Sequence, residues 1–105
     1  MEKFHKLIIK KSKQFILYTP HAIHQMNSEK RMITTDEIEE KINKGKIIED
    51  YPEDKRGHSC LINGKISERP LHVVCAPKDE YLAIITAYIP DDSKWNDNYT
   101  RRKKS

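Results

Sequence analysis

The side chains in this sequence that suit proton transfer and phosphate binding are histidines, tyrosines and arginines. They are His21, Arg31, Tyr51, His58, His72, Tyr88, Arg101 and Arg102. Cleavage of RNA without a metal needs such groups, because one must take the 2′-hydroxyl proton and another must protonate the leaving oxygen. Cations then stabilise the charged phosphorane. The inventory is compatible with this chemistry but is not specific to it.

Motifs for a metal or a nucleotide cofactor are missing from the sequence. His21 and His24 are three residues apart on one expected helix face, which allows metal binding only with a third ligand nearby. No His-Glu-x-x-His pattern is present, and packing or capping at a helix start is the commoner role for His21. With three glycines in all, the chain lacks the glycine-rich loops that cradle nucleotide phosphates. We therefore expect neither a metal nor a cofactor.

Cellular location follows from the cysteines and from the apolar runs. Cys60 and Cys75 lie in apolar segments, so we expect two buried, inert thiols in a reducing environment. No apolar run approaches the ~20 residues of a membrane span. The first residues, Met-Glu-Lys-Phe-His-Lys, lack the apolar segment of a signal peptide. These features predict a cytoplasmic protein without a membrane segment.

Positive charge gathers at the two ends of the chain. Lysine and arginine number 20 against 16 acidic residues, for a net charge of +4. Residues 1–14 hold five lysines and one glutamate, and residues 101–104 read Arg-Arg-Lys-Lys, so the stretch between them is net acidic. Basic ends favour RNA or DNA as partner, although they also serve solubility alone. Near the tail, Trp95 and Tyr99 suit stacking on bases or, for Trp95, pinning the C-terminal segment to the sheet.

The front half of the chain has the periodicity and caps of helices. Residues 3–11 follow helical spacing, and residues 14–19 have the composition of a strand or extended connection. Thr19 and Pro20 supply a cap and a first-turn proline for a helix that runs to about Ser28.

A further helix has the clearest start signal in the chain. Thr34 and Glu37 form a capping box, and Ile33 and Ile38 form the matching hydrophobic staple. Gly45 is expected to end this helix in the left-handed conformation.

After Gly45 the apolar period changes to two, which predicts strands. The expected strands cover residues 47–51, 59–66, 71–76 and 81–88. The turn between the second and third strands is placed at residues 67–69 rather than at Asn63-Gly64.

The last two strands are expected to pair with Ala76 opposite Tyr81, which would place His72 opposite Ile85. One face then carries Leu71, Val73, Cys75, Leu82 and Ile84 and should meet the helices, with His72 on the more open face. The fold class is α+β, with N-terminal helices packed on a largely antiparallel sheet of four to five strands, in a single domain over residues 1–105.

Several segments together resemble a small prokaryotic family of domains of unknown function. The resemblance covers roughly residues 15–102. Its segments are His21-Ala22, Met26, residues 31–34, 45–52, 58–61, 69–76 and 84–91, Lys94-Trp95 and Arg101. That family is similar to RelE/ParE-like, BrnT-like and MqsR-like toxins, whose helices precede a curved antiparallel sheet. The resemblance implies a metal-independent endoribonuclease that cleaves mRNA and is neutralised by an antitoxin protein of the YgiT-type zinc-finger or helix-turn-helix kind.

The resemblance also implies roles for individual residues. His72 would act as general acid or base, and His21 would be the second group that transfers a proton. Tyr88 would orient the nucleotide, while Arg31 and Arg101 would hold phosphate. The tail would add non-specific attraction to RNA through Arg102, Lys103 and Lys104.

Two other functions stay open at this stage. One is a non-catalytic module that binds a protein or RNA, which the acidic middle of the chain favours. The other is a different small enzyme on the same scaffold. Homodimerisation is also left open.

Overall fold

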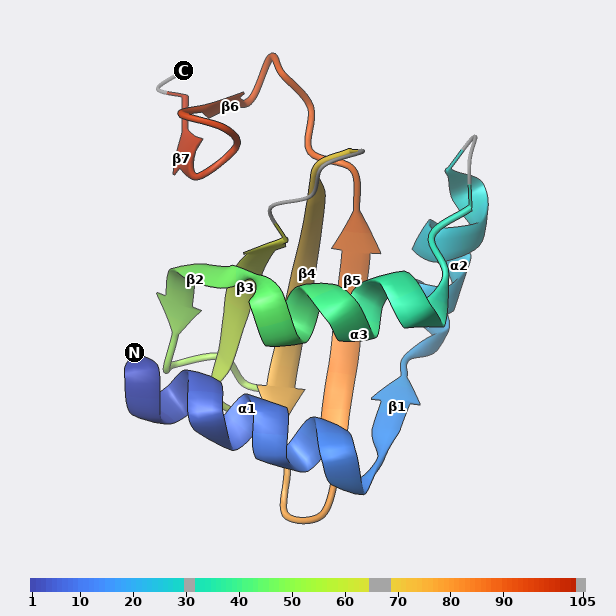
Figure 1. Cartoon of the computed structure of the whole chain (residues 1–105), viewed down its shortest axis with the longest axis vertical. Helices are drawn as coiled ribbons and strands as arrows, with labels where there is room; N and C mark the ends of the chain where they lie inside the picture. The colour runs from blue at the N-terminus through green and yellow to red at the C-terminus, as the bar shows by residue number, and fades with distance from the viewer. Residues whose placement is uncertain (30–31, 65–68, 104–105) are drawn as a thin grey trace.

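The structure, a computed structural model, describes residues 1–29, 32–64 and 69–103. Three helices and two β-sheets make up this part of the chain (Figure 1). In chain order they are α1 (Glu2–Gln14), β1 (Ile16–Tyr18), α2 (Pro20–Ser28), α3 (Thr35–Lys44), β2 (Lys46–Tyr51), β3 (Ser59–Gly64), β4 (Leu71–Pro77), β5 (Leu82–Tyr88), β6 (Trp95–Asn96) and β7 (Arg101–Arg102).

The larger sheet has the strand order β1-β5-β4-β3-β2, and of the pairs that the described residues form in it only β1–β5 is parallel. Helices α1 and α3 cross one face of this sheet, and α2 packs beside β5 (Figure 1). Strands β6 and β7 form a separate antiparallel hairpin. The predicted α+β class is therefore confirmed. Among the described residues, no helix has the length and apolar character that crossing a membrane requires.

The predicted starts of α2 and α3 are confirmed by their caps. Thr19 Oγ1 accepts the backbone N–H of Ala22 at 3.1 Å, and Thr34 Oγ1 accepts that of Glu37 at 3.1 Å. The predicted capping box is supported too, because, next to the larger effect of Arg69, a hydrogen bond from the Thr34 backbone helps to lower the pKa of the Glu37 carboxyl. The Glu37 carboxylate also pairs with Arg69, whose Nε and Nη2 donate to it at 2.9 and 2.7 Å. This bidentate pair ties α3 to the segment that leads into β4.

Gly45 ends α3, but the expectation of a left-handed residue is wrong. Its φ and ψ are −77° and −176°, which is extended backbone. A Cβ at this position would lie 2.4 Å from the Lys41 carbonyl oxygen and 2.8 Å from that of Asn63. Glycine is therefore required here by the close approach of α3 and β3, not by backbone handedness.

The predicted helix-facing side of the sheet is confirmed. Its side chains are fully buried and include Leu71, Val73, Cys75, Leu82 and Ile84. They pack against apolar side chains of the three helices, among them Ile8, Ala22, Met26, Ile38 and Ile42. The prediction that Cys60 and Cys75 are buried thiols is also confirmed. Hydrogen bonding between the two thiols and burial raise the pKa of Cys75, so it is a poor nucleophile.

The predicted register of β4 and β5 is wrong. Ala76 pairs with Ala83, because a four-residue turn closes with the Lys78 N–H donating to the Tyr81 carbonyl at 2.8 Å. A bulge on β5 then adds one more residue to this shift of two, so His72 lies opposite Tyr88 instead of Ile85.

Candidate functional site

His72 faces away from the helices, as predicted, but it is fully buried rather than open. Its Nε2 lies 2.7 Å from the Tyr99 carbonyl oxygen, and its Nδ1 lies 3.3 Å from the Tyr88 hydroxyl. A carbonyl only accepts hydrogen bonds, so Nε2 must carry a proton. In the neutral ring, Nδ1 then accepts from Tyr88. These two contacts fix both the tautomer and the orientation of the imidazole.

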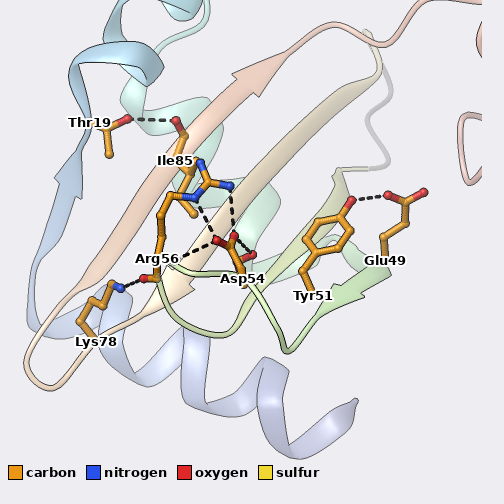
Figure 2. Close-up of polar contacts among 8 residues, drawn as sticks. Thr19, Glu49, Tyr51, Asp54, Arg56, Lys78 and Ile85 are labelled. Carbon is orange, nitrogen blue, oxygen red and sulfur yellow. Dashed lines mark hydrogen bonds and ion pairs between the residues drawn. The ribbon is translucent and has the colours of Figure 1, made fainter.

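The hairpin of β6 and β7 covers His72. Trp95 meets the His72 ring edge-on with ring centroids 4.4 Å apart, and it is 5% exposed. The Arg102 guanidinium lies 4.7 Å from the Trp95 ring centroid. Arg102 also donates to Glu49 at 2.7 and 3.1 Å, and Glu49 accepts the Tyr51 hydroxyl (Figure 2). Trp95 therefore pins the C-terminal segment to the sheet, which is one of the two roles predicted for it.

The loop of this hairpin has an unusual backbone. Asp97, Asn98 and Tyr99 have φ values of 51°, 57° and 68°, a region that costs non-glycine residues roughly 1–2 kcal/mol each. His72 and Asn63, which lie opposite each other in the sheet, hold the loop. The Asn63 amide donates to the Asn98 carbonyl at 3.3 Å, beside the bond from His72 to Tyr99. In this structure His72 thus serves to clamp the hairpin.

The pKa of His72 is lowered, mainly because burial disfavours the charged ring. The hydrogen bond to the Tyr99 carbonyl and the charge of Glu49 oppose this effect, and the charge of Arg102 adds to it. His72 is therefore neutral near pH 7.

A loss of stability in mild acid is expected from this lowered pKa. Below about pH 6.5 the unfolded chain protonates His72 while the folded chain does not. The free energy of unfolding should therefore fall as the pH drops from about 6.5 towards the lowered pKa of His72. Urea denaturation at several pH values, followed by Trp95 fluorescence, measures this slope. The His72→Gln variant should have a flatter pH dependence in this range, and an unchanged slope would contradict the assignment.

A second feature is a hollow of about 400 Å³ beside β1 and β5, which we call the His21 hollow. It is lined by Leu17, Thr19, Pro20, His21, Arg56, Lys78, Tyr81, Ala83 and Ile85. The start of α2 borders this hollow, and a helix N-terminus favours anions. Thr19 fixes that start, because its hydroxyl donates to the Ile85 carbonyl at 2.9 Å (Figure 2).

The cations of the His21 hollow are held by the loop between β2 and β3. Arg56 donates to Asp54 through Nε at 3.1 Å and through Nη2 at 3.0 Å. Lys78 Nζ donates to the Arg56 carbonyl (Figure 2). The hydrogen bonds from Arg56 and from Ser59 hold the pKa of Asp54 far below its ordinary value, so this carboxylate stays charged. The arrangement can attract an anion such as a phosphate group.

The residues predicted to form the site are distributed over two places. His72, Tyr88 and Arg102 lie together beneath or within the hairpin. His21 lines a hollow whose lining includes neither His72 nor Tyr88.

The remaining predicted residues belong to the C-terminal segment or are not described. Arg101 is exposed and pairs with Asp97, Nη1 to Oδ2, at 3.3 Å. Lys103 is exposed, and Arg31 and Lys104 lie outside the described residues. Within the described ranges, no three His, Cys, Asp or Glu side chains gather as a metal-binding group.

Sequence reasoning missed Arg56, Lys78 and Tyr81. The one signal for Arg56 and Lys78 was that residues 54–58 and 77–80 are charged turns, and no such signal pointed to Tyr81.

A comparison with protein families shows that most of the chain matches one family. Residues 18–89 match the family described as domain of unknown function DUF4258. The match includes every residue that lines the His21 hollow except Leu17, and it ends before the hairpin. Neither the curated proteins nor the solved structures give a significant match. Because the matched segment is well over half of the chain, the protein belongs to the DUF4258 family.

Proposed function

We propose that this protein is a metal-independent endoribonuclease that binds single-stranded mRNA in the His21 hollow. The observation that supports this proposal is the meeting of His21, Arg56, Lys78 and Tyr81 in one hollow at the start of α2. These side chains supply a proton acceptor, two cations for phosphate and an aromatic ring for stacking on a base. The resemblance to toxins extends the proposal to action in the cytoplasm and to an antitoxin partner.

The proposed reaction assigns one task to each side chain. His21 takes the proton of the 2′-hydroxyl, the 2′-oxygen attacks phosphorus, and the bond to the 5′-oxygen breaks. The leaving 5′-oxygen takes a proton from water. Arg56 and Lys78 stabilise the added negative charge on the phosphorane, and Tyr81 stacks against a base. The products carry a 2′,3′-cyclic phosphate and a 5′-hydroxyl. His72 then positions the hairpin instead of transferring a proton.

The test is binding and cleavage of a labelled oligoribonucleotide in EDTA, beside a deoxy oligonucleotide of the same sequence. We expect the protein to cut RNA and leave cyclic phosphate ends, and to bind the DNA without cutting it. Arg56→Gln should weaken binding and cleavage. Lys55→Gln should not, because Lys55 is an exposed neighbour that does not line the hollow. A folded protein that neither binds nor cuts RNA would overturn the proposal.

A second candidate is a module that binds RNA without cutting it. The contacts of His72 with the hairpin and with Tyr88 favour it, because they leave His21 as the one histidine among the described residues that line the hollow. This alternative would be established if the protein bound the RNA and the DNA oligonucleotide with equal affinity and cleaved neither of them.

A further inference from the structure

A larger hollow adjoins the His21 hollow and is not used by the proposed reaction. It measures about 560 Å³ and is lined by Leu7, Lys11, Gly57, Pro77, Lys78, Asp79 and Tyr81. Lys78 and Tyr81 belong to the lining of both hollows. The two spaces are therefore neighbours, with these two side chains between them, and we call this one the Lys11 hollow.

The ammonium groups of the Lys11 hollow are held in place by backbone carbonyls. Lys11 Nζ, from the last turn of α1, donates to the Asp79 carbonyl at 2.5 Å. Lys78 Nζ donates to the Arg56 carbonyl. Gly57 has a φ of +106°, and a Cβ there would lie 2.8 Å from Lys78 Nζ. A side chain at Gly57 would therefore occupy the place of the ammonium group, and each lysine keeps further N–H donors for another acceptor.

Positive charge continues from one hollow to the other. Arg56 and Lys78 serve the first, and Lys78 and Lys11 serve the second. Among the described residues, Asp79 is the one acidic residue that lines either hollow, and Asp54 pairs with Arg56 from outside both linings. An aromatic ring with cations on both sides matches the alternation of base and phosphate along a single strand.

We infer that the Lys11 hollow is a subsite for the nucleotide adjacent to the one bound in the His21 hollow. Lys11 binds the phosphate of this second nucleotide, and Tyr81 stacks against a base at the junction of the hollows. The inference rests on the proposed function, because it assumes a nucleic-acid strand in the first hollow. It adds a length requirement, since only a ligand that spans both hollows contacts Lys11.

The test compares wild type, Lys11→Gln and Lys13→Gln in binding mononucleotides and a series of oligoribonucleotides of increasing length. Lys13 is an exposed lysine of the same helix turn that lines neither hollow. We expect Lys11→Gln to bind long oligonucleotides several-fold more weakly and to bind a mononucleotide as wild type does. The slope of log affinity against log salt should fall by about 0.7 for the long ligand, as for one lost phosphate contact on a single strand.

The outcomes separate this inference from the proposed function. Suppose that Lys11→Gln and Lys13→Gln bind long RNA with the same affinity while Arg56→Gln binds it poorly. The proposed subsite is then wrong, and RNA binding in the His21 hollow is still supported. If wild type binds none of the ligands, both proposals fail. Because Lys11 also contacts the turn at Asp79, the urea midpoint of Lys11→Gln is measured alongside. A weaker affinity without the length dependence would also overturn the subsite.

Discussion

Replacing His72 by alanine is expected to lower the free energy of unfolding by about 3 kcal/mol and to loosen the C-terminal hairpin. The variant leaves the buried Tyr99 carbonyl without its donor and removes the ring that Trp95 packs against. The left-handed backbone of residues 97–99 also loses its hydrogen bond from β4 and keeps the one from Asn63 of β3. Trp95 is the one tryptophan of the chain. Its fluorescence therefore reports the hairpin directly, and its emission should shift to longer wavelength.

Two variants separate the contacts of His72. His72→Gln keeps an N–H donor for the Tyr99 carbonyl and should retain most of the hairpin packing. Tyr88→Phe removes the hydroxyl that donates a hydrogen bond to His72 Nδ1, a long contact of 3.3 Å. This variant should lower the free energy of unfolding by about 1 kcal/mol or less. If His72→Ala leaves both the urea midpoint and the Trp95 emission unchanged, the hairpin does not depend on this histidine.

Local chemistry made the helices and the core face predictable. The threonine caps of α2 and α3 act within three residues of their own position, so the sequence order alone brings donor and acceptor together. The alternation in residues 71–76 and 82–85 likewise fixes which side chains face the helices, whatever the register. These predictions needed no knowledge of distant segments.

The register depended on how one short turn closes, and the hollow depended on distant segments. Tyr81 belongs to the turn because its carbonyl closes it, and this moves the pairing of Ala76 by two residues. The parallel pairing of β1 with β5 joins residues more than sixty positions apart. That pairing brings the start of α2 to the turn of Lys78, and no local pattern signals it.

The environment of His72 could not be predicted from the sequence, because it too depends on distant segments. Its residue type and position on a strand indicated proton transfer on an open face. The segment that covers it begins beyond β5 and is held by Glu49 and Asn63, which belong to two other strands. Asp and Asn tolerate left-handed backbone, but Tyr99 does so rarely, so this sequence does not favour such a loop. The chemistry of a histidine could thus be recognised, whereas its burial could not.

Replacing His21 by alanine is expected to have the largest effect on the proposed activity. Removing a positioned general base lowers a cleavage rate by about 10²–10⁴-fold. Arg56 and Lys78, the cations proposed to bind phosphate, stay in place, so affinity for the RNA should change little. Single-turnover cleavage of a labelled oligoribonucleotide, with protein in excess, measures the chemical step apart from binding.

The matched control is His24→Ala, because His24 is an exposed histidine of the same helix that does not line the hollow. It should cleave at the wild-type rate. Imidazole added to the buffer should restore part of the activity of His21→Ala, since a free base can enter the space that the side chain leaves. Equal rates for the two variants would remove His21 from the reaction. If Arg56→Gln still bound weakly in that case, the hollow would remain a binding site, and a different group would have to accept the 2′-hydroxyl proton.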